Sequence, residues 1–170
     1  RELPPVKASF AAFVAGVHAI KPTATVLTAY LGNWDDVSAG KEQALALIQR
    51  GADVIFQNAD AAGLGVFQAA KERQGIAVIG SNSNQNGVAP GLVLGSVVID
   101  LPHAFLLVAK EVAGGTFRGR VIPLGMRDDV VRWEPAEVLL TRLPPAFAAR
   151  MDSTRLTMQA GRFPMPALTP

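Results

Sequence analysis

Three polar loops of this 170-residue chain hold side chains suited to recognising a small molecule. They span residues 32–35, 57–60 and 80–86; all are rich in side-chain amides, and the first carries a tryptophan. Amides both donate and accept hydrogen bonds, and an indole ring stacks on planar groups. This combination predicts a pocket for a neutral, flat, hydrogen-bonding ligand. The predicted ligand-binding residues are Trp34, Asn58, Asp60, Gly63, Asn82, Asn84 and Gln85.

Turn formation is the competing explanation for these residues. Asn and Asp favour turns and helix caps for local hydrogen-bonding reasons, and for any single amide this explanation is the stronger one. Asp35 and Asp36 fit helix caps better than ligand contacts. Trp34 differs, because an indole in a polar loop is costly unless it packs on something.

Motifs for catalysis and metal binding are absent from the sequence. It contains no GxSxG elbow, Walker A loop, HExxH motif or cysteine. Gly63 and Gly65 match the first two glycines of a GxGxxG dinucleotide-binding fingerprint, but Gln68 stands where the third glycine is required. The two glycines fit instead a site where the backbone approaches closely and the free amides of a helix N-terminus face a ligand. His18 and His103 have no partner at metal-ligand spacing. We therefore predict no catalytic residue, no metal site and no cofactor.

Composition and charge exclude further classes of function. Hydrophobic residues make up 49% of the chain, yet no apolar run reaches the ~18 residues that a membrane-spanning helix needs. The net charge is +2 and the basic residues are scattered, so we predict no nucleic-acid partner. No signal peptide is visible at the start, and residues 1–5 fit an internal boundary in a longer protein. The lack of cysteine does not identify a compartment.

Two hydrophobic periods alternate along the chain and predict alternating helices and strands. Helices are expected over residues 6–20, from Asp35 or Asp36 to Arg50, 63–73, 102–112 and 145–160. Strands are expected over 24–30, 54–56, 76–79, 92–98, 121–122 and, less regularly, 130–133. Short apolar strands separated by helices are typical of a parallel sheet covered on both faces. The fold class is therefore predicted to be doubly wound α/β.

The polar loops each follow a predicted strand. In open parallel sheets, ligands bind outside the carboxyl ends of the strands. We therefore expect the loops at 32–35, 57–60 and 80–86 to project from one edge of the sheet.

Several motifs resemble the BMP (basic membrane protein) family, solute-binding lipoproteins of ABC transporters that include purine nucleoside receptors. The most specific are GADVIFQ at 51–57 and GLGVFQAAKE at 63–72. Others are YLGNWDD at 30–36, GKE at 40–42, APGLVLGSVV at 89–98, GTFRG at 115–119 and PLG at 123–125. The likeness runs from about residue 6 to the end of the chain.

The resemblance implies a type I periplasmic-binding fold, in which two α/β lobes close on a ligand. Residues 1–100 are expected to form the ligand-binding core of the second lobe, and 101–170 the returning C-terminal segments. The first lobe, signal peptide and lipidated cysteine are expected to precede Arg1. The implied function is capture of a nucleoside-like small molecule for an ABC permease by a lipid-anchored protein in the periplasm or at the cell surface.

The resemblance also assigns roles to individual positions. An aromatic at the position of Trp34 stacks on the base, and the family's Gly-Gly-Thr-Gly loop matches residues 60–63. An acid at the position of Asn82 binds ribose hydroxyls, assisted by a Lys at the position of Ile99. Losing both charged partners avoids the roughly 3–5 kcal/mol cost of leaving one buried charge alone. The paired change therefore predicts an altered ligand rather than a decayed site.

Two other classes of function remain open at this point. A ligand-sensing transcription regulator uses the same fold and would carry a DNA-binding headpiece before residue 1. An α/β enzyme would need an acid, base or nucleophile at the strand ends, and the polar loops do not supply a recognisable set.

Overall fold

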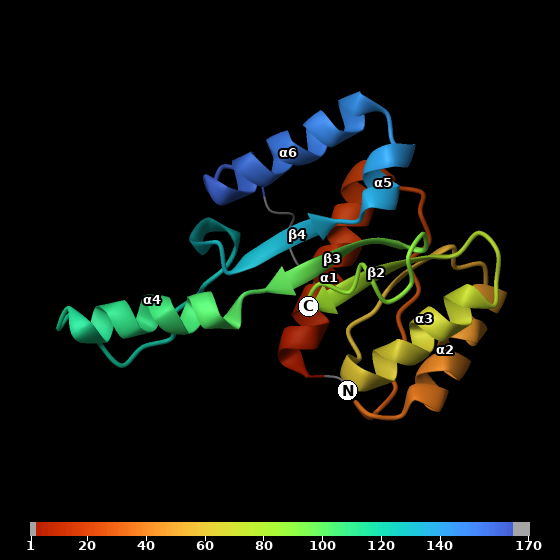
Figure 1. Ribbon diagram of the computed structural model, residues 1–170, viewed down its shortest axis with the longest axis horizontal. Helices are drawn as coiled ribbons and strands as arrows, with labels where there is room; N and C mark the ends of the chain where they lie inside the picture. The colour runs from red at the N-terminus through yellow and green to blue at the C-terminus, as the bar shows by residue number, and fades with distance from the viewer. Residues whose placement is uncertain (1–2, 165–170) are drawn as a thin grey trace. The chain divides into compact units, whose positions relative to one another are not determined.

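Residues 3–164 are described by a computed structural model that contains helices and short strands (Figure 1). The helices are α1 (Pro4–Ile20), α2 (Val37–Gln49), α3 (Gly63–Lys71), α4 (Leu101–Ala113), α5 (Glu137–Arg142) and α6 (Pro145–Gln159), with 3-10 turns η1 (Asp60–Ala62) and η2 (Met126–Asp128). The strands are β1 (Val54–Phe56), β2 (Ala77–Asn82), β3 (Val93–Ile99) and β4 (Val131–Pro135).

The strands form a mostly parallel sheet in the order β1-β2-β3-β4. β4 is the exception, because it runs antiparallel to β3, with Gly95 opposite Pro135 and Ile99 opposite Val131. A Cβ at Gly95 would collide with the ring of Trp133. The predicted α/β class with a largely parallel sheet is thus confirmed.

The chain divides into two compact units, which are described separately below. The first contains residues 1–78 and 164–170, and the second contains residues 79–163. The boundary between them falls inside β2. The functional division expected at residue 100 stays a prediction.

In the first unit, α2 and α3 approach closely because glycines lie where the helices meet. A Cβ on Gly40 would collide with the carbonyl of Ala62, and one on Gly65 with the carbonyl of Val37. These backbone groups cannot rotate away as a side chain could, so the contact depends on glycine. Phe67 of α3 is also buried, at 1% exposed.

Aromatic rings join α1 to the rest of the first unit. The Phe10 ring lies 5.9 Å from the Tyr30 ring and 5.9 Å from the Phe56 ring, measured between centroids. Phe13 also contacts Phe56, at 5.1 Å. Tilted and edge-on pairs at these distances are favourable beyond simple burial. Two of the helical-period residues predicted for α1 therefore bind the helix to β1.

Two predicted strands are wrong. Residues 24–30 form no strand, and residues 121–122 lie in irregular chain, where Val121 is 91% exposed. Apolar β-branched runs favour extended backbone, but a strand also needs a hydrogen-bonding neighbour. Tyr30 packs on Phe10 of α1 instead.

In the second unit, α4 follows β3 directly and has no buried residue (Figure 1). The small apolar core of this unit lies on and around the strands, and it comprises Ala89, Val93, Val98, Val130 and Ala136. The predicted helix over 102–112 and strand over 130–133 are confirmed as α4 and β4.

Candidate functional site

The loop that carries Trp34 is fixed at both ends by hydrogen bonds. Asn33 Oδ1 accepts from the N–H of Asp36 at 3.0 Å, and Asp36 Oδ1 caps α2 by accepting from the N–H of Ala39 at 2.9 Å. The N–H of Ala62 donates to the Trp34 carbonyl at 2.8 Å, which joins the loop to η1. Trp34 is half-buried. The expected aspartate cap is confirmed at Asp36.

The loop after β1 is shaped by a buried amide. Gln57 is 3% exposed, and its Oε1 accepts from the N–H of Ala59 at 3.1 Å. A Cβ at Gly63 would collide with this same oxygen, so a side chain there would require the Gln57 amide to move. Asp60 has a φ of 54°, in the left-handed region that Asn and Asp tolerate better than most residues. Strained positions of this kind concentrate at functional sites.

A cavity of about 70 Å³ lies in the first unit, between α1, α2 and the end of β1. Its polar lining comes from Asn33, Gln43, Gln57 and Asn58. The cavity is far smaller than the roughly 300–1,000 Å³ that encloses a drug-sized ligand. The cavity is therefore too small to enclose a ligand of that size. Trp34 is not among its lining residues.

In the second unit, the amides of the third polar loop are engaged with the protein itself. Asn84 Nδ2 donates to Glu134 Oε2 at 2.6 Å, and Gln85 Oε1 accepts from the N–H of Ser81 at 3.0 Å. Asn82 ends β2 with a φ of 66° and is exposed. Turn formation therefore accounts for much of this loop, and ligand contacts by Asn82, Asn84 and Gln85 stay predictions.

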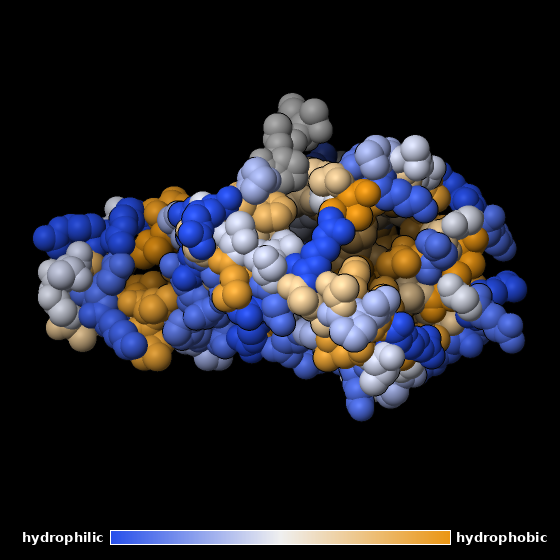
Figure 2. All heavy atoms as spheres, turned by 90° about the horizontal axis from the view of Figure 1, so that it is seen from above, coloured by the Kyte–Doolittle hydropathy of each residue, from blue (hydrophilic) through white to orange (hydrophobic). Residues whose placement is uncertain are grey.

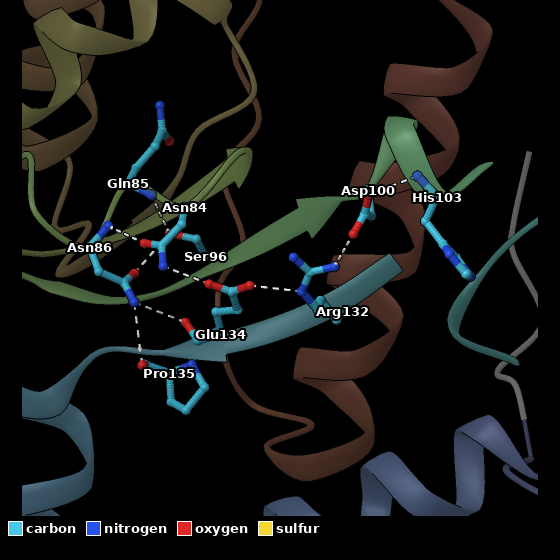
Figure 3. Close-up of polar contacts among 9 residues, drawn as sticks. All are labelled: Asn84, Gln85, Asn86, Ser96, Asp100, His103, Arg132, Glu134 and Pro135. Carbon is cyan, nitrogen blue, oxygen red and sulfur yellow. Dashed lines mark hydrogen bonds and ion pairs between the residues drawn. The ribbon is translucent and has the colours of Figure 1, made fainter. Parts of the chain in front are cut away.

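The inner part of this loop is anchored on the fully buried Ser96. Its hydroxyl accepts from the N–H of Gln85 at 3.0 Å and donates to Asn86 Oδ1 at 2.8 Å. Asn86 Nδ2 in turn donates to the carbonyls of Glu134 and Pro135, at 3.2 and 3.3 Å (Figure 3). The loop is thereby attached to both β3 and β4.

Arg132 connects this network to the start of α4. Its Nε donates to Glu134 Oε1 and its Nη1 to Asp100 Oδ2, both at 2.8 Å (Figure 3). Asp100 also caps α4, because its Oδ1 accepts from the N–H of His103 at 3.0 Å. The hydrogen bond from His103, followed by that from Arg132, holds the pKa of Asp100 below its usual range. The same carboxylates raise the pKa of Arg132.

The structure brings part of the predicted site together. In the first unit, one hydrogen bond links the Trp34 loop to the turn that begins at Asp60 and leads into Gly63. Asn82, Asn84 and Gln85 belong to the second unit, and a shared edge for all three loops stays a prediction.

The energetic coupling expected between positions 82 and 99 stays a prediction. In the described chain, Asn82 is exposed and Ile99 is 40% exposed.

The sequence analysis assigned no part in a polar network to Ser96, Arg132 or Glu134. Ser96 could have been noticed, because it is a polar residue inside an otherwise apolar strand, and such a group needs a buried partner. Arg132 and Glu134 stand two apart on β4 and so share one face. Their partner Asp100 is distant in sequence, and no local pattern predicts that pairing.

Over residues 3–164, no group of three or more His, Cys, Asp or Glu side chains is arranged to hold a metal ion. No helix in this same range is long and apolar enough to cross a membrane.

Comparison with known families places the chain. A family model described as ABC transporter substrate-binding protein PnrA-like, or Bmp, matches residues 1–150. The chain belongs to this family. It is a family of substrate-binding proteins rather than of enzymes. The resemblance drawn from the sequence motifs is thus confirmed.

Curated relatives include basic membrane proteins and a purine-binding protein. Basic membrane protein B of Borrelia garinii subsp. bavariensis is 34% identical over 110 residues, which is 62% of this chain and 32% of that protein. A purine-binding protein of Brucella abortus is 27% identical over 159 residues, which is 94% of this chain and 43% of that protein. The chain therefore spans less than half the length of these relatives.

Solved structures show the same fold. An ABC transporter solute-binding protein from Conexibacter woesei gives a TM-score of 0.75 at 24% identity, over 99% of this chain and 55% of that one. A transcriptional activator of the comK gene from Bacillus halodurans gives a TM-score of 0.68 at 26% identity, over 79% of this chain and 47% of that one. The predicted type I periplasmic-binding fold is confirmed by these likenesses.

Proposed function

We propose that this chain supplies part of the binding surface of an ABC-importer substrate-binding protein whose ligand is a purine nucleoside or a related purine-like molecule. The observation that carries the proposal is the Trp34 loop, which presents a half-buried indole on a turn fixed by the Ala62 N–H. Because the turn is already fixed, the Trp34 indole should lose little conformational freedom when a flat ligand stacks on it. Asn58, Asp60, Asn82, Asn84 and Gln85 are the proposed polar contacts.

Support for a purine-like ligand comes from family membership and from the Brucella abortus relative described as purine-binding. The proposed partners are this small molecule and a membrane permease. The proposed location is the periplasm or the cell surface, as expected for a lipid-anchored binding protein. The residues at 82 and 99 differ from those that the resemblance implies for ribose recognition, so the ligand class is taken as purine-like rather than strictly ribonucleoside.

The test is the tryptophan signal of the chain. Trp133→Phe should be tolerated, because Trp133 Nε1 is buried without a hydrogen-bond partner among the described residues, and it leaves Trp34 as sole reporter. Adenosine, inosine or guanosine should then quench or shift the fluorescence. Trp34→Ala in the unsubstituted chain should weaken binding by about 1–3 kcal/mol in calorimetry, as for nucleobase stacking on aromatic residues.

A monosaccharide without a planar ring is the matched negative ligand for this titration. Equal affinity of the unsubstituted chain and Trp34→Ala for every purine nucleoside would exclude a stacking role for Trp34.

A second candidate function is ligand sensing in a transcription regulator. The likeness to the Bacillus halodurans transcriptional activator, at 26% identity over 79% of this chain, favours it. The complete gene discriminates between the two, because a regulator requires a DNA-binding segment and an importer component requires an export signal.

A further inference from the structure

We propose that Arg132 and Glu134 are positioning residues for the amide loop, residues 81–86, and that they tie this loop to the start of α4. The inference rests on the proposed function, because Asn82, Asn84 and Gln85 of this loop are proposed ligand contacts. It follows from a continuous set of hydrogen bonds within the second unit (Figure 3).

The inner end of the amide loop is held by uncharged bonds that do not involve Arg132. Ser96 is fully buried, and its hydroxyl bonds both the N–H of Gln85 and the side chain of Asn86. A Cβ at Gly80 would lie 2.7 Å from this hydroxyl, so the start of the loop packs directly on it. Water cannot readily replace these bonds, and this end should stay ordered without outside help.

The outer end of the loop depends on a charge. Asn84 is exposed, and its amide donates to Glu134 Oε2 at 2.6 Å. Bonds to an ionised acceptor are about twice as strong as neutral ones, so the carboxylate competes with water where a neutral group would not. Asn84 Oδ1 also accepts from the N–H of Asn86 at 2.9 Å, which closes the turn. The orientation of Glu134 therefore sets the position of Asn84.

Arg132 fixes the orientation of Glu134. Its planar guanidinium donates from Nε to Glu134 and from Nη1 to Asp100. A rigid fork holds both carboxylates at defined angles, which a flexible lysine could not do. Because Asp100 is also the N-cap of α4, the loop and the start of this helix share one set of bonds.

The partial exposure of these side chains indicates whether they order the loop or stabilise the whole domain. The side chains of Arg132, Asp100 and Glu134 are 43%, 29% and 29% exposed. Ion pairs this open contribute little to the stability of a whole domain. Their effect should therefore appear mainly as order in the amide loop, with only a small gain in melting temperature.

Glu134→Gln and Arg132→Met are the informative variants. The first keeps the shape and an acceptor but removes the charge, and the second keeps the apolar stem of Arg132 without its donors. Glu137→Gln is the matched control, because it removes an exposed carboxylate on the neighbouring α5. Hydrogen–deuterium exchange of the ligand-free chain should rise about tenfold at 81–86 in both variants, as expected for a lost charge-assisted bond. The control and helix α3 should be unchanged.

A double variant tests the route of action. If Glu134 acts through Asn84, then adding Glu134→Gln to Asn84→Ala should change loop exchange by less than twofold, since coupled residues are not additive. The affinity for purine nucleosides should fall in each single variant in step with loop exchange. Fully additive effects, or a lower melting temperature with unchanged exchange at 81–86, would overturn the positioning role.

The two proposals fail in different ways. If the complete protein that contains this chain binds no purine nucleoside, the proposed function is contradicted, while the exchange comparison still decides whether Arg132 and Glu134 hold the loop. If the wild-type chain binds and Glu134→Gln binds equally well with equal loop exchange, only the positioning role is contradicted.

Discussion

Asp100 serves two elements with its two carboxylate oxygens. One oxygen caps α4 through the N–H of His103, and the other accepts from Arg132. Both bonds favour the ionised form, which is why the pKa of Asp100 lies below its ordinary value. The stabilisation is therefore fully present above the ordinary aspartate pKa and is lost as the pH falls through the lowered one.

The stability lost in Asp100→Asn should therefore depend on pH, because only the ionised form of Asp100 gives this stabilisation. Asparagine can still cap α4 but cannot pair with Arg132. The melting temperature of the wild-type chain should exceed that of the variant near neutral pH, and the difference should shrink as the pH falls below about 4. Thermal unfolding from pH 3 to pH 7 measures it, with the exposed Asp53→Asn as control for loss of charge. A difference that is independent of pH would exclude the ion pair as its cause.

At the scale of elements, the close approach of α2 and α3 depends on glycines. Gly65→Ala would drive a methyl group into the backbone carbonyl of Val37, and overpacking of this kind typically costs about 1–3 kcal/mol of unfolding free energy. Gly16→Ala in α1 is the matched control, because no atom lies within 4 Å of the added methyl. The control should stabilise the chain by about 0.5–1 kcal/mol, as alanine does inside helices. Urea unfolding of both variants compares them; equal effects would mean that α2 and α3 can separate without cost.

Local signals predicted most of the elements. The helices α1, α2, α3, α4 and α6 carry periodic apolar residues, and Asp36 marks the start of α2 with a cap that the structure confirms. The strands β1, β2 and β3 are short apolar runs that do find neighbours. Residues 24–30 have a similar composition but form no strand in the described chain. Strand formation is a property of pairs of segments, and one segment alone does not reveal it.

The sequence predicted which residues belong to the candidate site, but not their hydrogen-bond partners. The motif around Trp34 was found from the sequence, and the structure gives it a fixed turn. Asn84 and Gln85 were also found, yet the structure shows their side chains bonded to Glu134 and to the N–H of Ser81. The partner strand β4 lies about fifty residues later, and its antiparallel register decides which groups meet. Sequence patterns do not predict the register between two strands that lie so far apart in the chain.

At the scale of the whole molecule, α4 presents an apolar surface. None of its residues is buried, and Leu101, Phe105 and Val112 are 57%, 73% and 58% exposed. Figure 2 shows hydrophobic side chains among hydrophilic ones at the left of the view, where α4 lies. Exposed apolar side chains that gather on one helix can act as an association site in water.

The chain should therefore self-associate through α4 at high concentration. Phe105→Ser should shift sedimentation toward the monomer, because it removes the most exposed large apolar side chain of the helix. Val121→Ser is the control, since Val121 is even more exposed, at 91%, but stands outside any helix. A monodisperse wild-type chain, or equal effects of the two changes, would contradict association through α4.

The bonds around Asn86 also bear on how the molecule ages. Asparagine followed by glycine is prone to deamidation, in which the next backbone nitrogen attacks the side-chain carbonyl, and Asn86 precedes Gly87. Here that carbonyl accepts from Ser96, and the amide nitrogen donates to the carbonyls of Glu134 and Pro135. A side chain held this way cannot turn toward its neighbour's nitrogen, and conversion to aspartate would set a carboxylate against two carbonyl oxygens. Asn86 should therefore deamidate faster in Ser96→Ala than in the wild type during storage, as measured by mass spectrometry. The network thus protects the chain against chemical damage as well as ordering the loop.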